Sequence, residues 1–168
     1  MNIDLDYILE TTVELLGIPS PVGFTDAAMN RVGEELNALN VPFKMTKKRA
    51  IIAFIEGENR NYKKMISAHL DTLGAVVKKI KPNGRLELIS VGGCPWAGVE
   101  GENLTVHTLD GREYEGTLLP TKCSVHIYGD VAREMPRTAE TMEVRLDEDV
   151  HTAEDTEKLG IRVGDFVS

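Results

Sequence analysis

The sequence of 168 residues predicts an α/β segment followed by a β-rich, barrel-like domain. Two apolar repeats at helical spacing and several short apolar runs fill residues 1–70, as expected of an α/β layer. From residue 71 onward, short strands alternate with glycine-containing turns, which is typical of small barrels and sandwiches. We therefore expect three segments, at 1–70, 71–162 and 163–168, the last of them a strand.

Two helices are predicted in the first segment. Apolar residues recur at three- and four-residue spacing from Leu5 to Leu16, and Pro19 must follow the end of this helix. Thr25 is a good N-cap for the second helix, whose apolar stripe runs from Met29 to Leu39. Pro42 lies beyond its end.

Strands of the first segment are predicted where β-branched and aromatic residues cluster. The candidates are 43–46, 50–56 and 65–68. The last of these is a short apolar run that ends at His69, as a buried strand of an α/β sheet does.

The β-rich segment contains two hairpin signals. They are Pro82-Asn83-Gly84 and Asp110-Gly111, each between two apolar runs. Thr152 and Asp155 predict a capping box that opens a short helix, which Gly160 ends. The predicted strands of this segment are 76–81, 85–90, 104–108, 112–118, 124–128, 141–146 and 161–167.

The composition excludes several classes of partner. A net charge of −8 argues against nucleic acid and against an anionic membrane surface, since both need a basic face. No apolar run approaches the roughly 20 residues of a membrane span, and the acidic, mixed N-terminus is unlike a signal peptide. Cys94 and Cys123 are expected to be reduced. The sequence thus favours a cytoplasmic protein.

His69 and Asp71 are the candidate functional residues of the sequence. If they end a strand, they point to the same face, at the strand end where α/β sheets bind ligands. A neutral imidazole binds zinc, cobalt or manganese, and a neighbouring carboxylate orients the imidazole or a metal-bound water. One imidazole does not complete a site, because zinc takes three or more protein ligands. A hydrogen-bonded structural histidine is the alternative.

Other conspicuous residues have plainer interpretations. His107, His126 and His151 alternate with apolar neighbours and are expected to be strand or surface histidines. Trp96 is either a local packing anchor or a contact residue between subunits.

The segment Ser67-Ala68-His69-Leu70-Asp71-Thr72-Leu73-Gly74 resembles the first metal motif of the glutamyl/tetrahedral aminopeptidase family, some members of which have been labelled endoglucanases. The loop 16–23 resembles the family's N-terminal Pro-Ser-Pro loop. Residues 91–93, 104–108 and 110–111 resemble its insert domain, and 154–167 the segment that leads back to its catalytic domain. The resemblance therefore covers nearly the whole chain.

The resemblance implies a two-metal aminopeptidase that removes N-terminal residues from peptides and uses two divalent ions, zinc, cobalt or manganese. Residues 1–70 would be the incomplete N-terminal part of the catalytic domain, and 71–162 a β-rich insert through which homo-oligomers form. Residues 163–168 would begin the return strand. His69 would be a metal ligand, and Asp71 would be the catalytic carboxylate that positions the site.

In the family, the remaining site residues follow the insert, and this chain contains none of them. The 168-residue chain is therefore expected to be inactive alone, and the apolar faces of 1–70 to lack partners. A non-catalytic assembly or binding module is the alternative function. An endoglucanase would need two carboxylates that flank a sugar bond, and the sequence singles out no such pair.

Overall fold

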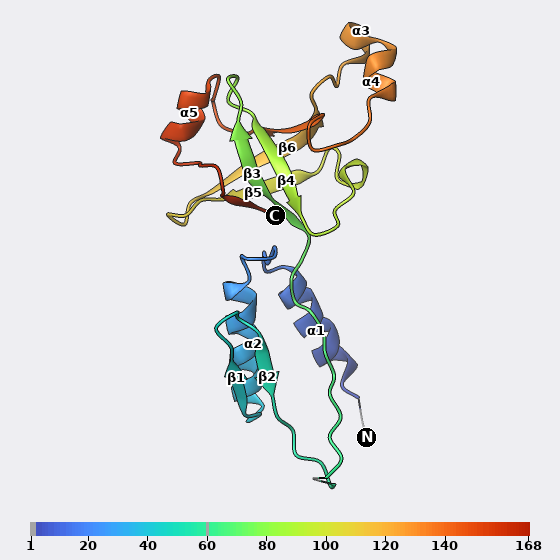
Figure 1. Cartoon of the computed structure of the whole chain (residues 1–168), viewed down its shortest axis with the longest axis vertical. Coiled ribbons are helices and arrows are strands. Elements are labelled where there is room, and N and C mark those ends of the chain that lie inside the picture. The colour runs from blue at the N-terminus through green and yellow to red at the C-terminus, as the bar shows by residue number, and fades with distance from the viewer. Residues whose placement is uncertain (1–2, 60) are drawn as a thin grey trace. The chain divides into compact units, whose positions relative to one another are not determined.

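The computed structural model describes residues 3–59 and 61–168. It divides the chain into two compact units, Met1–Thr72 and Leu73–Ser168, which Figure 1 colours from blue to green and from green to red. No helix within the described ranges is long and apolar enough to cross a membrane.

The first unit contains two helices and a two-stranded antiparallel sheet. The helices are α1 (Leu5–Leu16) and α2 (Asp26–Ala38), and the strands are β1 (Phe43–Met45) and β2 (Ile51–Ala53). Both helices form where the apolar spacing predicts them. Thr25 is the N-cap of α2, as expected, but its side chain makes no capping hydrogen bond.

The two helices are joined by an ion-pair network. Arg31 on α2 contacts Glu14 on α1 and Glu35 on its own helix, each at 2.7 Å. On another side of α2, Gly33 lies so close to Phe43 that a Cβ there would stand 3.2 Å from the ring. This glycine lets β1 pack tightly against the helix.

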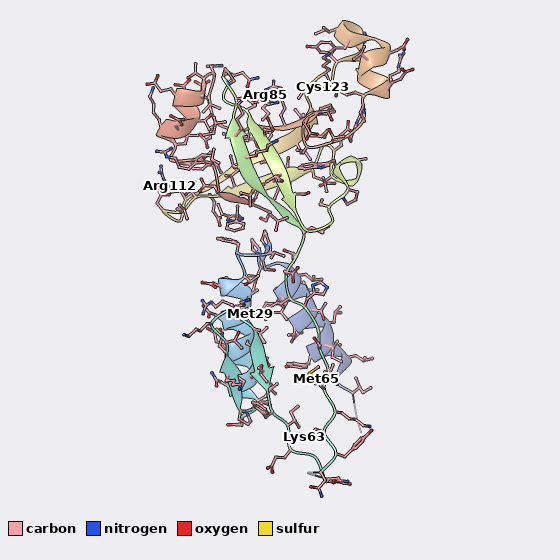
Figure 2. All side chains as sticks on the ribbon, in the orientation of Figure 1. Met29, Lys63, Met65, Arg85, Arg112 and Cys123 are labelled. Atoms are coloured by element: carbon pink, nitrogen blue, oxygen red, sulfur yellow. The ribbon has the colours of Figure 1, made fainter. Side chains whose placement is uncertain are left out.

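Much of the apolar surface of this unit is exposed. No residue of α1 is buried, and several of its apolar side chains face solvent. The strand predicted at 65–68 is absent: the segment is extended but unpaired, and Ile66 is 96% exposed. A strand needs a neighbour to accept and donate its backbone hydrogen bonds, and the described residues of this unit offer none there. Figure 2 labels Met65 in this segment.

The second unit is a closed antiparallel barrel with strand order β3-β4-β7-β6-β5-β8 (Figure 1). This confirms the predicted barrel-like fold. Its strands are β3 (Gly74–Ile80), β4 (Leu86–Val91), β5 (Asn103–His107), β6 (Glu113–Pro120), β7 (Met142–Leu146) and β8 (Phe166–Val167).

The barrel core consists of inward-facing aliphatic side chains. Burying one such side chain contributes about 1.5–3 kcal/mol to folding. The residues of the core that are at most 2% exposed are Val77, Leu86, Leu88, Val106, Leu118, Met142, Val144, Leu146, Ile161 and Val167.

Short helices decorate the barrel: η1 (Trp96–Gly98), α3 (Val125–Tyr128), α4 (Asp130–Glu134) and α5 (Ala153–Lys158). The predicted capping box of α5 is present, and Gly160 follows it with a φ of +92°. The strand predicted at 124–128 is wrong, because this segment is α3. Its backbone bonds locally, Tyr128 N to Ser124 O at 2.9 Å, and Ile127 is exposed. The alternating apolar side chains of this segment therefore do not contribute to a buried core.

The last strand is shorter than predicted and lies within the barrel. Only Phe166 and Val167 are strand, and they pair with both β3 and β5, which closes the sheet. Residues before them form a turn in which Arg162 N donates to Asp165 Oδ2 at 2.7 Å. The division between the two compact units falls after Thr72, so residues 163–168 belong to the same unit as 73–162.

Candidate functional site

The His69 segment is held in place by the loop around Ser20. Ser20 is fully buried, and its hydroxyl donates to the carbonyl oxygen of Leu70 at 3.0 Å. The amide of Thr72 donates back to the carbonyl oxygen of Ser20 at 3.0 Å. Pro21 and Thr72 form an isolated parallel bridge. The backbone on both sides of Asp71 is therefore fixed.

His69 and Asp71 lie next to each other, as the sequence predicts, although no strand places them. The Nδ1 atom of His69 lies 3.2 Å from the carbonyl oxygen of Asp71 and 3.5 Å from its Oδ1. When Nδ1 carries the proton, it donates to this carbonyl and leaves the Nε2 lone pair available. The side chain of His69 is 83% exposed, so an incoming ligand can reach Nε2.

This donor set fits part of a metal site. An imidazole oriented by a neighbouring oxygen is a common metal ligand, and a carboxylate beside it can position a bound water. Within residues 3–59 and 61–168, no group of three or more His, Cys, Asp or Glu side chains is placed to hold a metal ion. His69 and Asp71 thus supply one imidazole and one carboxylate, fewer than zinc requires.

The other histidines lie in the barrel unit. His107 lies in β5, where Nδ1 contacts Glu113 Oε1 at 3.0 Å and Nε2 contacts Ser168 Oγ at 2.8 Å. His126 lies in α3, and the exposed His151 pairs with Asp149 at 3.1 Å. They are barrel and surface histidines, as expected. Trp96 packs against the barrel core, which supports its interpretation as a packing anchor.

Ser20 and Thr72 are positioning residues that the sequence analysis did not single out. A signal was present, since Ser20 stands between two prolines. Proline has no N–H group, so Ser20 has the one backbone donor of this tripeptide, and it donates to Thr72 Oγ1 at 3.3 Å.

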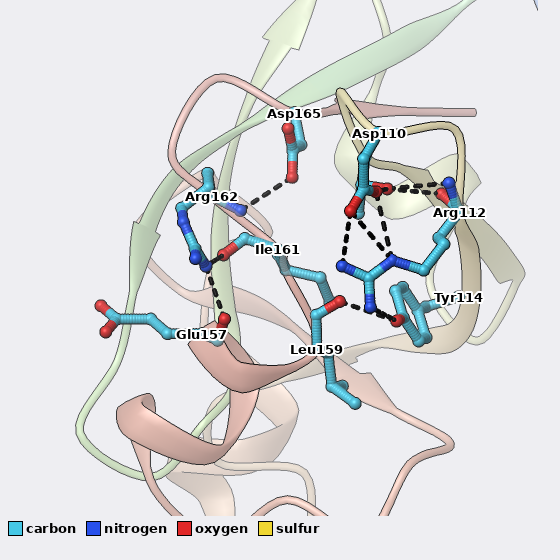
Figure 3. A network of polar contacts seen from close by, with 9 residues as sticks. Asp110, Arg112, Tyr114, Glu157, Leu159, Ile161, Arg162 and Asp165 are labelled. Atoms are coloured by element: carbon cyan, nitrogen blue, oxygen red, sulfur yellow. Dashed lines mark hydrogen bonds and ion pairs between the residues drawn. The ribbon is translucent and has the colours of Figure 1, made fainter.

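A second polar cluster, in the barrel, is structural (Figure 3). The Arg112 guanidinium beside Asp110, 2.6 Å away, holds the pKa of that carboxyl far below its usual range. Arg112 also donates to the Tyr114 hydroxyl, which donates to the carbonyl oxygen of Leu159 at 2.7 Å. These bonds tie the β5–β6 hairpin to the end of α5.

Comparisons with known proteins show which family the chain resembles. The sequence model of the M42 glutamyl aminopeptidase family matches residues 50–168. The protein named "Putative aminopeptidase YhfE" from Bacillus subtilis (strain 168) is 44% identical over 160 residues, which is 95% of this chain and 46% of that protein.

Two solved structures share the fold. Aminopeptidase APDkam598 from the archaeon Desulfurococcus kamchatkensis matches with a TM-score of 0.82 and 25% identity, over 96% of this chain and 42% of that one. The Pyrococcus horikoshii TET1 peptidase, which can assemble into a tetrahedron or a large octahedral shell, has a TM-score of 0.71 and 19% identity, over 95% of this chain and 45% of that one.

The chain therefore spans somewhat less than half the length of these relatives. The family match covers well over half of the chain and includes both the His69–Asp71 pair and the whole barrel. On these grounds the chain belongs to the M42 glutamyl aminopeptidase family.

Proposed function

We propose that this chain is part of a cytoplasmic, metal-dependent aminopeptidase that removes N-terminal residues from peptides. The observation that carries the proposal is the coincidence of the family match over 50–168 with an oriented His69–Asp71 pair inside that range. When bound, two divalent ions (zinc, cobalt or manganese) would supply polarisation of the scissile carbonyl and activation of a water.

His69 and Asp71 have separate roles in this proposal. His69 would hold one metal through Nε2, and the Asp71 carbonyl orients the imidazole ring for this role. The Asp71 carboxylate would be the catalytic group that positions the site. The hydrogen bonds that Ser20 makes with Leu70 and Thr72 restrain the backbone around His69 and Asp71 in the geometry that both roles need.

The 168-residue chain alone is proposed to be inactive, because one imidazole and one carboxylate are too few ligands. We propose that residues 1–70 are part of the catalytic domain. We assign the barrel, 71–162, as an inserted domain, and 163–168 as the approach of the return strand.

A chimera tests the function directly. Residues 1–168 of this chain replace the aligned 46% of YhfE, and the chimera, unmodified YhfE and the isolated chain are assayed on a panel of short peptides with zinc, cobalt or manganese. We expect metal-dependent release of N-terminal amino acids by the chimera and none by the isolated chain. Activity of the isolated chain would overturn its proposed incompleteness.

Variants of the chimera separate the two roles. We expect His69→Ala to abolish both activity and binding of one metal equivalent, whereas Asp71→Asn retains metal but loses activity. His126→Ala is the matched control, since this exposed histidine lies in α3 of the barrel unit. Full activity of the His69→Ala chimera would exclude the ligand role.

A non-catalytic assembly module is the second candidate, and one observation favours it. The barrel has a closed sheet and its own buried core, whereas α1 buries no residue. Homo-oligomers would form through the barrel, as the assembling TET1 relative suggests. Light scattering after size-exclusion chromatography tests this, and a strictly monomeric chain would exclude it.

A further inference from the structure

The barrel carries a surface cavity of about 310 Å³ between the β3–β4 turn and the β7–α5 loop. This volume is at the lower end of the range of small-molecule sites, roughly 300–1,000 Å³. The cavity lies outside the unit that contains His69, and no role has been assigned to it so far. Its charged lining residues are Arg85, Arg145, Glu148, Asp149 and His151.

The backbone of the cavity walls is restrained by one buried hydrogen bond and two exposed ones. Thr156, which is fully buried, donates its hydroxyl to the carbonyl oxygen of Gly84 at 2.7 Å. Gly84 has a φ of +79°, and a Cβ there would stand 3.0 Å from the carbonyl oxygen of Thr152. On the other wall, the Asp155 carboxylate accepts from the amides of His151 and Thr152. The cavity is thus preorganised.

Two guanidinium groups line it. Arg85, labelled in Figure 2, is anchored by the buried carboxylate of Glu143 at 2.5 Å, which also accepts from Lys81 at 2.8 Å. A guanidinium has five N–H donors, and this anchor uses one of them, so Arg85 retains donors for a ligand. Across the part of the chain that the structure describes, the Arg145 side chain has no hydrogen-bond or ion-pair partner.

Carboxylates line the same cavity. Glu148 and Asp149 lie on the β7–α5 loop, and Asp149 already pairs with His151 at 3.1 Å. This contact is exposed and is an ion pair only when His151 is protonated, so both carboxylates are available to a cation. Glu148 is the one whose side chain has no hydrogen bond or ion pair among the described residues. A cavity with both positively and negatively charged groups suits a small ligand that itself carries one positive and one negative charge, because each ligand charge then lies beside its opposite.

We propose that this cavity binds a free α-amino acid as its zwitterion. The carboxylate of the ligand accepts from Arg145 and Arg85, since arginine forks match carboxylates in a bidentate geometry. Its ammonium group donates to Glu148. Free amino acids are the products of an aminopeptidase, and the assignment of the site as a product sensor rests on the proposed function.

Calorimetric titration of the purified 168-residue chain tests the site. The probes are L-alanine, acetate and methylamine, with no metal added. We expect saturable binding of L-alanine with a Kd below about 10 mM and at least tenfold weaker binding of acetate or methylamine. The Arg145→Gln and Glu148→Gln variants should each bind L-alanine at least tenfold more weakly. Neither substitution removes a side-chain hydrogen bond or ion pair among the described residues, so both variants should fold.

Arg133→Gln, an exposed arginine on α4 outside the cavity, is the control and should bind normally. Absence of saturable L-alanine binding overturns the proposal, as does equal binding of acetate, which indicates an anion site only. If the chimera is inactive but the 168-residue chain still binds L-alanine, the proposed aminopeptidase function is wrong and the amino-acid binding site is retained.

Discussion

The hydroxyl of Ser20 donates to the carbonyl oxygen of Leu70, which lies 50 residues later in the chain, at 3.0 Å. Leu70 is the residue between His69 and Asp71, so the bond restrains the peptide that joins the two candidate site residues. Because Ser20 is fully buried, its own polar atoms also depend on this contact.

Replacing Ser20 with alanine should loosen the site. The substitution leaves the Leu70 carbonyl without this donor, which costs about 1–3 kcal/mol of stability in the first unit. The Thr72 amide, bonded to the Ser20 backbone, should exchange its hydrogen faster. Hydrogen-exchange mass spectrometry and urea unfolding measure both effects. Ser67→Ala, at an exposed serine of the same unit, is the control and should change neither.

Glu143 should make the barrel sensitive to acid. Burial raises the pKa of this carboxyl, but the bonds from Lys81 and Arg85 outweigh burial and hold it below its ordinary value of 4.5. A carboxyl with a lowered folded-state pKa stabilises the fold above its unfolded-state pKa. This stabilisation is lost as the pH falls below about 4.5 and through the folded-state value.

Glu143→Gln should therefore lower the free energy of unfolding at pH 7 by about 1–3 kcal/mol and flatten its dependence on pH in the acidic range. Urea unfolding at a series of pH values measures both. The exposed Glu115→Gln variant should show the wild-type dependence of the unfolding free energy on pH. If Glu143→Gln also kept the wild-type dependence in the acidic range, the stabilising role of the Glu143 carboxylate would be contradicted.

Gly116 should tolerate no side chain. A Cβ at this position would stand 2.7 Å from the carbonyl oxygen of Arg145 and 2.8 Å from Val144 Cγ1, on the neighbouring strand β7. Overpacking of this kind costs about 1–3 kcal/mol, which thermal unfolding of Gly116→Ala would detect. Gly93→Ala, where a Cβ meets nothing within 4 Å, should melt at the wild-type temperature or slightly above.

His107 should hold the closing strand of the barrel. Its side chain is buried and bonds to Ser168 Oγ and Glu113, and the Ser168 and Thr105 backbones exchange two hydrogen bonds beside it. His107→Leu should cost about 1–3 kcal/mol and speed exchange of the Thr105 amide. His151→Leu, at an exposed position, should do neither.

Local signals predicted much of the fold. The helix from Leu5 to Leu16, both barrel hairpins and the capping box at Thr152 form where spacing, turn residues and caps indicate. These signals act within a few residues, so they are visible in the sequence. The errors arose where strand identity depends on a distant partner. Segments 65–68 and 124–128 have strand-like composition, but no described strand pairs with either.

The site shows the same division between local and distant information. The proximity of His69 and Asp71 follows from their spacing, and the structure retains it without a strand. The burial of Ser20 depends on a contact across 50 residues, and the pairing of Phe166 with β3 and β5 depends on closure of the barrel. The flanking prolines mark Ser20 in the sequence, but neither its distant partner nor the closure of the barrel can be read from neighbouring residues.

The first and last strands of the barrel are hydrogen-bonded neighbours, with Ala75 opposite Val167. The two ends of this unit therefore lie side by side. A unit with adjacent ends can be placed in a surface loop of another protein, because both junctions then fall at one position. An engineer could on this basis transfer residues 73–168 as a single piece, joined at each end by a short linker.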